Sequence, residues 1–442
     1  MTELTSPART ASFARPARAG RAETVRFALT HTLPAFARGI AAPRPRLAAA
    51  FGALGQYGWS TATLRSLRAR YGGAPVRIRG LSGELLVLLD PADVARFFAE
   101  PVAHLAMDAV DKVRMLEVLE PTGVICSHGA LREARREVND HALAADRPVH
   151  PSCAEFLAVV AEECAPLTAS DVLEYAALRR ALERIGRRIV LGDRAAHDEE
   201  LHRGLVRLRE EANWMGMRKS RNPANERLYA QVAARLEKYA AEAPPHTLVA
   251  RALSVPAGPE FPELDPAGQA HHWLLAVDAV ALVVARTLLM LAVHPAEQDA
   301  ARGDDTRMRA CLQESLRLWP VVPDLVRVTR AETVWRGVAY PAGTHVLVPV
   351  GFLQRDPQTV PAAELFVPGR WLARDADRDT RMAPFGHGGG RCPGDQLGLL
   401  LGTAVCRELL RGRRVSPPAG APHPCRPLPG ALLPTPLPLC AH

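Results

Sequence analysis

One segment, residues 266–293, constrains the fold more than any other, because it is apolar nearly all round. It is followed by His294-Pro295, and a proline at that point ends a helix. A helix that is apolar on every side is stable only inside a large domain or within a membrane. Asp278 and Arg286 leave no uninterrupted run of about 18 apolar residues. We therefore expect a helix that crosses the core, with no membrane span.

The pattern around this segment is mainly helical. Apolar residues recur at helical spacing through most of residues 105–415, and residues 178–192 are predicted to form a helix that stops at Gly192. Further helices are predicted at residues 60–71, 91–98, 304–319 and 395–410. Residues 75–80 and 84–90 are predicted to form a β-hairpin, and residues 333–350 a second β-rich stretch. We expect the last 28 residues, which are rich in proline, to be loop and turn. The fold class is therefore mainly α with a small β portion.

The 442 residues are enough for one large domain. We expect residues 61–442 to form it, preceded by a partly flexible N-terminal segment, residues 1–60. The first fifty residues are rich in arginine and poor in acids, which resembles a transit peptide in composition. Because arginine also replaces lysine almost everywhere else, a disordered bacterial leader is the preferred interpretation.

Charge and cysteine content exclude several classes of function. The net charge is +8, but no basic stripe with interleaved aromatic residues and no nucleic-acid motif accompanies it. The cysteines are scattered without a C-x-x-C pair, which argues against zinc and iron–sulfur sites and against a disulfide framework. We expect a protein of the reducing cytoplasm.

A single cysteine, Cys392, lies in a glycine-dense loop directly before the predicted helix 395–410. The segment begins at Phe385 and reads F-G-H-G-G-G-R-C-P-G. Glycines allow a backbone to approach a flat ligand closely and to adopt positive φ. The helix N-terminus that follows offers amide donors and partial positive charge, which favour a metal-binding thiolate. The alternative is a glycine-rich turn with a buried cysteine.

Two weaker features precede this loop. Glu314 and Arg317 lie three residues apart on a predicted helix, so they share a face and can form an ion pair. Arg370 belongs to residues 366–371, F-V-P-G-R-W. Each feature alone is common in exposed helices and loops. Only their combination with the cysteine loop, in this order along the chain, indicates a function.

In this order and at these spacings, the three features resemble the cytochrome P-450 superfamily of haem-thiolate enzymes. The signature F-x-x-G-x-R-x-C-x-G is matched at four positions, which are Phe385, Gly388, Cys392 and Gly394. The resemblance implies the cytochrome P-450 fold, haem b as cofactor and Cys392 as the axial ligand of its iron. It also implies that a buried ion-pair triad supports the cysteine loop, formed by Glu314, Arg317 and Arg370. In this family the thiolate favours O–O cleavage.

The match is incomplete at the haem propionates. The signature arginine position is Gly390, and an arginine occurs one residue later, as Arg391. One propionate partner is therefore missing or replaced. The resemblance implies further propionate partners at Arg327 and at the H-x-x-x-R pattern of His128 and Arg132, with Arg135 as the alternative to Arg132. For each of these residues a plain surface charge is an equally good interpretation.

The larger departure lies in the long apolar helix, where the family carries small–Gly–x–acid–Thr. Counting back from His294-Pro295 places residues 275–279, L-A-V-D-A, on this motif. The acid is kept as Asp278, and Ala279 replaces the threonine that helps to deliver protons during oxygen activation. A substrate hydroxyl or ordered water can take its place, peroxide can replace dioxygen, or the reaction needs no such delivery. Asp278 could alternatively pair with a neighbouring helix.

Two other groups of polar residues have simple alternatives. His271 and His272 could form a proton relay or a metal pair, although core or helix-start histidines are preferred. Arg218, Lys219 and Arg221 could bind an acidic substrate group, although a solvated charge run is preferred.

The resemblance implies a soluble bacterial monooxygenase that hydroxylates or epoxidises a mostly apolar small molecule of secondary metabolism. Electrons would come from ferredoxin and ferredoxin reductase, or from flavodoxin, because the chain has no room for a fused flavin domain. An acidic partner would meet Arg391, Arg407, Arg411, Arg413 and Arg414. The family binds its substrate between residues 100–126, 210–226, 266–293, 324–327 and the C-terminal turn. The alternatives are a peroxygenase, an isomerase or dehydratase, and a haem-binding sensor without turnover.

Overall fold

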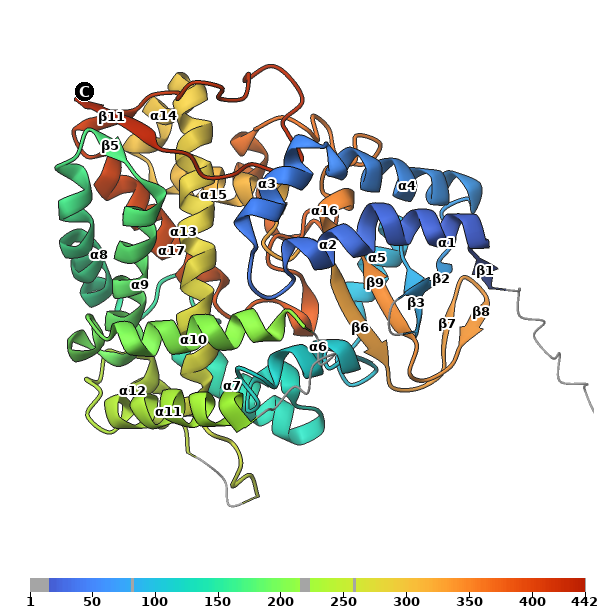
Figure 1. The fold of residues 1–442 in the computed structure, drawn as a ribbon, viewed down its shortest axis with the longest axis horizontal. Helices are drawn as coiled ribbons and strands as arrows, with labels where there is room; N and C mark the ends of the chain where they lie inside the picture. The colour runs from blue at the N-terminus through green and yellow to red at the C-terminus, as the bar shows by residue number, and fades with distance from the viewer. Residues whose placement is uncertain (1–15, 81–82, 215–222, 257–259, 442) are drawn as a thin grey trace, which may run out of the picture.

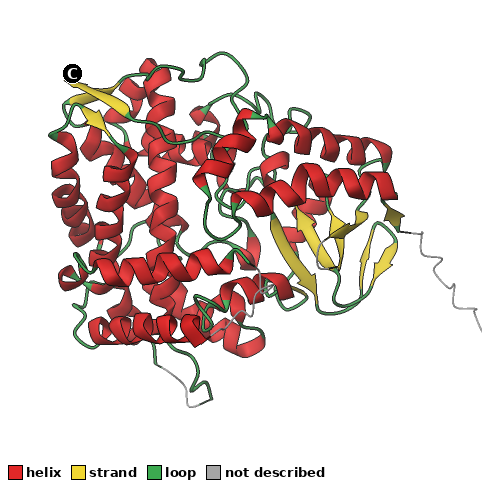
Figure 2. Cartoon of the chain, viewed as in Figure 1, coloured by secondary structure: helices red, strands yellow, loops and turns green. Residues whose placement is uncertain are grey.

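The computed structural model describes residues 16–80, 83–214, 223–256 and 260–441. A large helical mass occupies one side of the molecule, and a smaller part built around a β-sheet occupies the other (Figure 1). Figure 2 shows that helix predominates and that strands gather mainly in this smaller part. The expected class, mainly α with a small β portion, is confirmed.

The helices are the following, with π- and 3₁₀-turns labelled η: α1 (Arg21–Phe27), η1 (Ala28–Thr32), α2 (Leu33–Arg38), α3 (Pro45–Ala53), α4 (Gln56–Arg70), α5 (Pro91–Ala99), α6 (Val110–Leu116), η2 (Val124–Cys126), α7 (Gly129–Leu143), α8 (Cys153–Thr168), α9 (Tyr175–Leu191), η3 (Asp193–Ala195), α10 (Glu199–Ala212), α11 (Pro223–Ala240), α12 (Leu248–Leu253), η4 (Ala267–Gln269), α13 (Ala270–Val293), α14 (Pro295–Arg302), α15 (Asp305–Leu318), α16 (Val350–Leu353), η5 (Pro368–Leu372), η6 (Ala376–Arg378), η7 (Gly388–Gly390) and α17 (Asp395–Leu410).

The strands are β1 (Ala17–Arg18), β2 (Val76–Gly80), β3 (Gly83–Val87), β4 (Leu105–Ala106), β5 (Val172–Leu173), β6 (Leu325–Thr329), β7 (Thr333–Trp335), β8 (Val338–Tyr340), β9 (His345–Val348), β10 (Arg413–Val415) and β11 (Leu437–Ala441). They form a six-stranded sheet in the order β1-β2-β3-β9-β6-β4, a three-stranded sheet β10-β11-β5, and the pair β7-β8.

The predicted hairpin forms the middle of the larger sheet. β2 and β3 pair antiparallel with Val76 opposite Val87, while β9 adds to β3 in parallel and β6 adds to β9 antiparallel. Val76 and Val87 are buried, because one face of the sheet packs against helices. β6, which carries Arg327, lies between β9 and β4, so the sheet brings it next to a strand from the first quarter of the chain.

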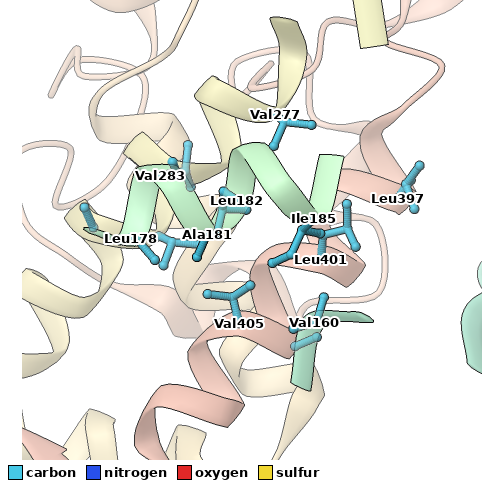
Figure 3. Packing of buried hydrophobic residues seen from close by; sticks show 14 of the residues in the cluster. Val160, Leu178, Ala181, Leu182, Ile185, Val277, Val283, Leu397, Leu401 and Val405 are labelled. Carbon is cyan, nitrogen blue, oxygen red and sulfur yellow. The ribbon is translucent and has the colours of Figure 1, made fainter. Parts of the chain in front are cut away.

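Helix α13 crosses the core, as its composition predicts. It packs against α9, α15 and α17, and Figure 3 shows its Val277 and Val283 among buried side chains of α8, α9 and α17. A Cβ on Gly186 of α9 would lie 2.8 Å from Val277, so that glycine allows the two helices to approach closely. By length and hydropathy alone residues 267–293 could cross a membrane, but 56% of the most apolar window is buried in the fold.

The two ends of the chain contain more regular structure than the sequence indicates. Helices begin at Arg21, inside the segment 1–60 that we expected to be partly flexible. The Glu23 side chain accepts a hydrogen bond from the Gly20 amide, which caps α1, and Phe27 is buried. At the other end the expectation of loop and turn alone is wrong, since β11 pairs with both β10 and β5. β5 lies more than 250 residues before β11 in the sequence, so the local composition around β11 does not reveal this pairing.

Candidate functional site

The cysteine loop contains glycines at positions where any other residue would strain the backbone or clash with a neighbour. Gly388 has φ +63°, and a Cβ there would lie 2.1 Å from the backbone oxygen of Phe98. The amide of Cys392 donates to the carbonyl of Phe385 at 2.9 Å, which closes the loop just before α17. The sequence FGHGGGRC therefore folds as a tight loop pressed against α5.

Cys392 is surrounded by protein, yet it keeps accessible surface, so its thiol faces a space inside the fold. Burial raises the pKa of the Cys392 thiol, while the amide of Gly394 and the guanidinium groups of Arg136 and Arg391 oppose that effect. The predicted stabilisation of a thiolate by the helix N-terminus is thus present but outweighed by burial. A cation bound to the sulfur would reverse the balance.

The triad of Glu314, Arg317 and Arg370 is assembled under the loop. Glu314 and Arg317 are both completely buried in α15, and the guanidinium donates two hydrogen bonds of 2.8 Å to the carboxylate. The Nε of Arg370 lies 3.2 Å from the same carboxylate. The amide of Val367 and the indole of Trp371 complete its hydrogen bonds, both at 2.9 Å. The three residues expected to form a triad are therefore in contact.

The triad is linked to the cysteine loop through Gln354. Arg317 donates to the carbonyl of Gln354 at 2.7 Å, and the amide side chain of Gln354 donates back to the carbonyl of Arg317. The Gln354 side-chain oxygen accepts from the amide of Ala383 at 2.7 Å, two residues before Phe385. The buried ion pair therefore fixes the start of the loop that carries the cysteine.

Buried cations gather on the other side of the loop. Arg132 of α7 donates to the carbonyl of Gly389 at 3.1 Å, and Arg327 of β6 donates to the carbonyl of Phe97. Burial, together with the nearby charge of Arg132, lowers the pKa of Arg327 to about 10. In the described part of the chain, Arg327 has no carboxylate partner. Lys112 of α6 lies near it, and burial lowers the pKa of Lys112 to about 8, with Arg327 contributing.

Gly390, the departure from the family signature, has a structural explanation. A Cβ at this position would lie 2.5 Å from Nη2 of Arg327 and 3.0 Å from the sulfur of Met107. The guanidinium of Arg327 therefore occupies the space into which a side chain at position 390 would project. The sequence identified both residues but could not show that one fills the place of the other.

The other residues predicted to contact the haem propionates have different environments. Arg135 donates to the carbonyls of Glu263 and Leu264, so Arg132, and not Arg135, reaches the cysteine loop. His128 caps α7 with 81% of its side chain accessible, and its ring lies 3.8 Å from Asp108. The guanidinium of Arg391 is held by Asp395, at 2.7 and 2.6 Å.

In α13, Asp278 and Ala279 point in different directions. Asp278 forms ion pairs with Arg209 of α10 at 2.5 Å and with Arg179 of α9 at 3.4 Å. Asp278 is therefore paired with neighbouring helices, which is the alternative considered from the sequence. The helix is regular through residues 275–279, and the glycine and threonine of the family motif are alanines here, which leaves no kink-forming residue.

His271 and His272 also have different environments. His271 is buried, stacks on Tyr229 and bonds to the carbonyl of Gly268, as expected of a core histidine. His272 instead forms an ion pair with Glu120, 2.8 Å from Nδ1 to the carboxylate. The sequence did not single out Glu120 or Lys112. The contact between Glu120 and His272 joins residues 152 apart, and no local pattern indicates it. Among the described residues no cluster of His, Cys, Asp or Glu could hold a metal.

The basic residues assigned to a redox partner are all paired. Carboxylates of the same chain hold each of them, in the pairs Arg391–Asp395, Arg407–Asp305, Arg411–Glu408, Arg413–Asp171 and Arg414–Asp299. This surface is therefore less positive than its arginine content indicates. Arg218, Lys219 and Arg221 lie outside the described residues.

Comparison with known proteins agrees with this geometry. Residues 283–440 match the sequence model of the family "Cytochrome P450". Cyclooctat-9-en-7-ol 5-monooxygenase of Streptomyces melanosporofaciens is 38% identical over 115 residues, 25% of each chain. Mitochondrial cytochrome P450 11B1 of Rattus norvegicus is 32% identical over 139 residues, 27% of this chain and 28% of the relative. The matched segments thus span about a quarter of these curated relatives.

Solved structures extend the likeness to most of the chain. A crystal structure of the cytochrome P450 CYP102L1 superposes with a TM-score of 0.69 at 16% identity, covering 87% of this chain and 94% of the other. A six-coordinated cytochrome P450 from Thermus thermophilus superposes with a TM-score of 0.61 at 20% identity, covering 81% and 91%. The chain has the fold of these proteins, and its C-terminal part, residues 283–440, matches the cytochrome P450 family model.

The residues present fit the haem that this family binds. A thiol faces an interior space from a loop in which glycines keep side chains away. Arg132 and Arg327 lie buried beside the same loop, and Arg327 lacks a carboxylate partner among the described residues. An anionic group at this position would be stabilised by both guanidiniums, as a haem propionate requires.

Proposed function

We propose that this chain binds haem b through Sγ of Cys392 and acts as a monooxygenase that hydroxylates or epoxidises a mostly apolar small molecule. The observation that carries the proposal is the position of Cys392, which faces an interior space from a loop fixed by the buried Glu314–Arg317 pair. When bound, the haem supplies the oxygen-activating chemistry. Phe385, Gly388 and Gly394 shape the loop that receives it.

The propionates would be held by cations of this chain. Arg132 and Arg327 are the proposed partners, with Arg327 taking the place left by Gly390. His128 and Arg391 are proposed further contacts at the rim, since both lie at helix N-termini next to the loop. Lys112, with its pKa lowered by burial, adds positive charge on the same side.

The first test is spectroscopic. The haem-loaded wild-type protein should show the absorption band typical of thiolate-ligated ferrous–CO haem, and Cys392→Ser should lose it. A wild-type protein without this band would overturn haem-thiolate ligation. Product formation with ferredoxin, ferredoxin reductase and NAD(P)H would support the monooxygenase, whereas activity with peroxide alone would exclude it.

The oxidant depends on residues 278 and 279. Ala279 offers no hydroxyl, and Asp278 is held by two arginines, so proton delivery would fall to a substrate hydroxyl or an ordered water. If dioxygen activation is only weakened by the alanine, Ala279→Thr should raise the fraction of NAD(P)H consumption that yields product. A lower yield would favour the second candidate, a peroxygenase or a haem-thiolate isomerase or dehydratase. A haem-binding sensor would gain support if neither oxidant gives product.

The substrate class and setting are further parts of the proposal. The name of the Streptomyces relative, cyclooctat-9-en-7-ol 5-monooxygenase, supports an alcohol with a largely hydrocarbon skeleton as the substrate class. We propose bacterial secondary metabolism as the setting. We propose residues 61–442 as the haem domain, preceded by the segment 1–60, and a cytoplasmic protein that receives electrons from ferredoxin or flavodoxin. Because the arginines around α17 are already paired, an acidic partner would have to compete with Asp395, Asp305 and Asp299.

A further inference from the structure

A histidine and a glutamate that come from distant parts of the chain meet inside the protein. Glu120, between α6 and η2, is 2% accessible, and its carboxylate accepts a 2.8 Å hydrogen bond from Nδ1 of His272 at the start of α13. A carboxylate buried to this degree is costly unless a charged or polar partner compensates it. His272 is that partner, so the ring is held in one orientation.

The other edge of the ring is open to an interior space. His272 is surrounded by protein, yet 53% of its side chain is accessible. Its Nε2 has no hydrogen-bond partner in the part of the chain that the structure describes. With Nδ1 committed to Glu120, Nε2 is the group that His272 presents to that space.

His272 shares a face of α13 with Ala279. At 3.6 residues per turn, residues 272, 276 and 279 form one stripe, while residue 278 lies about 120° from residue 272 around the helix. The accessibility of Ala276, and the partial accessibility of Ala279, agree with this stripe facing the same space. His272 and Ala279 are seven residues apart, which is about 10 Å along the helix axis.

We propose that His272, oriented by Glu120, anchors a hydroxyl or carbonyl oxygen at one end of an otherwise apolar substrate, about two helical turns from Ala279. The inference rests on the proposed function, because Ala279 marks the place of oxygen activation only if the chain binds haem as proposed. It adds a specific requirement: the substrate carries one polar oxygen on the order of 10 Å from the carbon that is oxidised.

The pair can bind two kinds of oxygen. Neutral His272 donates from Nδ1 to Glu120 and accepts a substrate O–H at Nε2, whereas protonated His272 donates from Nε2 to a carbonyl. The charge of Glu120 raises the pKa of His272. Cys126 and His271 are the other titratable groups that feel the Glu120 charge. Ketone binding should therefore weaken as pH rises through the raised pKa of His272, while alcohol binding should not.

The test is equilibrium binding to the haem-loaded full chain, measured by calorimetry with cyclododecanol, cyclododecanone and cyclododecane. We expect the wild type to bind the alcohol about three- to tenfold more tightly than the hydrocarbon, as for one net neutral hydrogen bond. The informative variant is His272→Asn, because the asparagine amide can still donate to Glu120 from the position of Nδ1 while Nε2 is removed. It should lose the preference for alcohol and the pH dependence of ketone binding.

His202→Gln is the control. His202 also pairs with a glutamate, Glu183, at 3.2 Å, but it lies on α10. This variant should keep both effects. Should His272→Asn fold poorly, Glu120→Gln tests the same idea, because it should move the pH midpoint of ketone binding downwards. Equal alcohol preference in wild type and His272→Asn, with the ferrous–CO band intact, would overturn the anchor and leave the proposed function standing. Loss of the band in wild type would overturn the proposed function itself.

Discussion

The clearest quantitative prediction concerns Glu314→Gln, which keeps the shape of the side chain and removes its charge. The carboxylate accepts five hydrogen bonds from four groups, and both it and Arg317 are completely inaccessible. The substitution leaves the Arg317 guanidinium buried without its counter-ion and turns an amide NH₂ towards donors. Removing one partner of a buried ion pair costs about 3–5 kcal/mol. That is about two to four powers of ten in the unfolding equilibrium.

The assay is urea unfolding followed by circular dichroism, with Asp305→Asn as control. Asp305 pairs with Arg407 at 3.0 Å, but its side chain is 62% accessible, so its loss should cost less than about 1 kcal/mol. Thermal melting is less sensitive, because a chain of 442 residues shifts by only about 1 °C per kcal/mol. If Glu314→Gln is no more destabilised than Asp305→Asn, the assigned role of the triad is refuted.

Three further outcomes are expected. Gly388→Ala places an alanine at φ +63° and against the Phe98 backbone, so it should lower the free energy of unfolding by more than about 2 kcal/mol. Gly398→Ala is the control, because a Cβ there meets open space and should not cause this loss. Urea titration of both variants measures the difference. Gly390→Ala should displace Arg327 and lower the haem-to-protein absorbance ratio after reconstitution, and an unchanged ratio would contradict the proposed propionate contact. Burial lowers the pKa of His31, but Asp324 overrides that effect and raises it, so stabilisation by this pair should be complete below about pH 6.5 and lost as pH rises through the folded pKa. The stability difference between wild type and Asp324→Asn should shrink from pH 6 to pH 9, and a constant difference would count against it.

The sequence predicted the parts of the site that depend on local chemistry. The cysteine loop, the core helix and the pairing of Glu314 with Arg317 follow from glycine content, apolar periodicity and helical spacing. The contacts between distant segments could not be read in this way. Nothing around Glu120 announces His272, and nothing around Asp278 indicates that Arg179 and Arg209 would both reach it.

The N-terminal helices and β11 were missed for a related reason. Alanine, arginine and proline give weak amphipathic signals, and the order of α1 depends on Phe27 packing into the sheet region and on the Tyr71 hydroxyl that donates to Glu23. β11 is a strand only because β5 and β10 offer it partners. In both cases tertiary contacts decide a structure that local propensity leaves open.

The contact between Arg327 and position 390 has a consequence for how this loop can change by mutation. A side chain at 390 collides with the guanidinium, and a small residue at 327 leaves the loop without its cation. Either substitution alone should therefore be harmful, while the double change Gly390→Arg with Arg327→Ala should recover part of the loss. The two positions form an epistatic pair, so a chain can pass from one arrangement to the other only through a weakened intermediate or by changing both positions together.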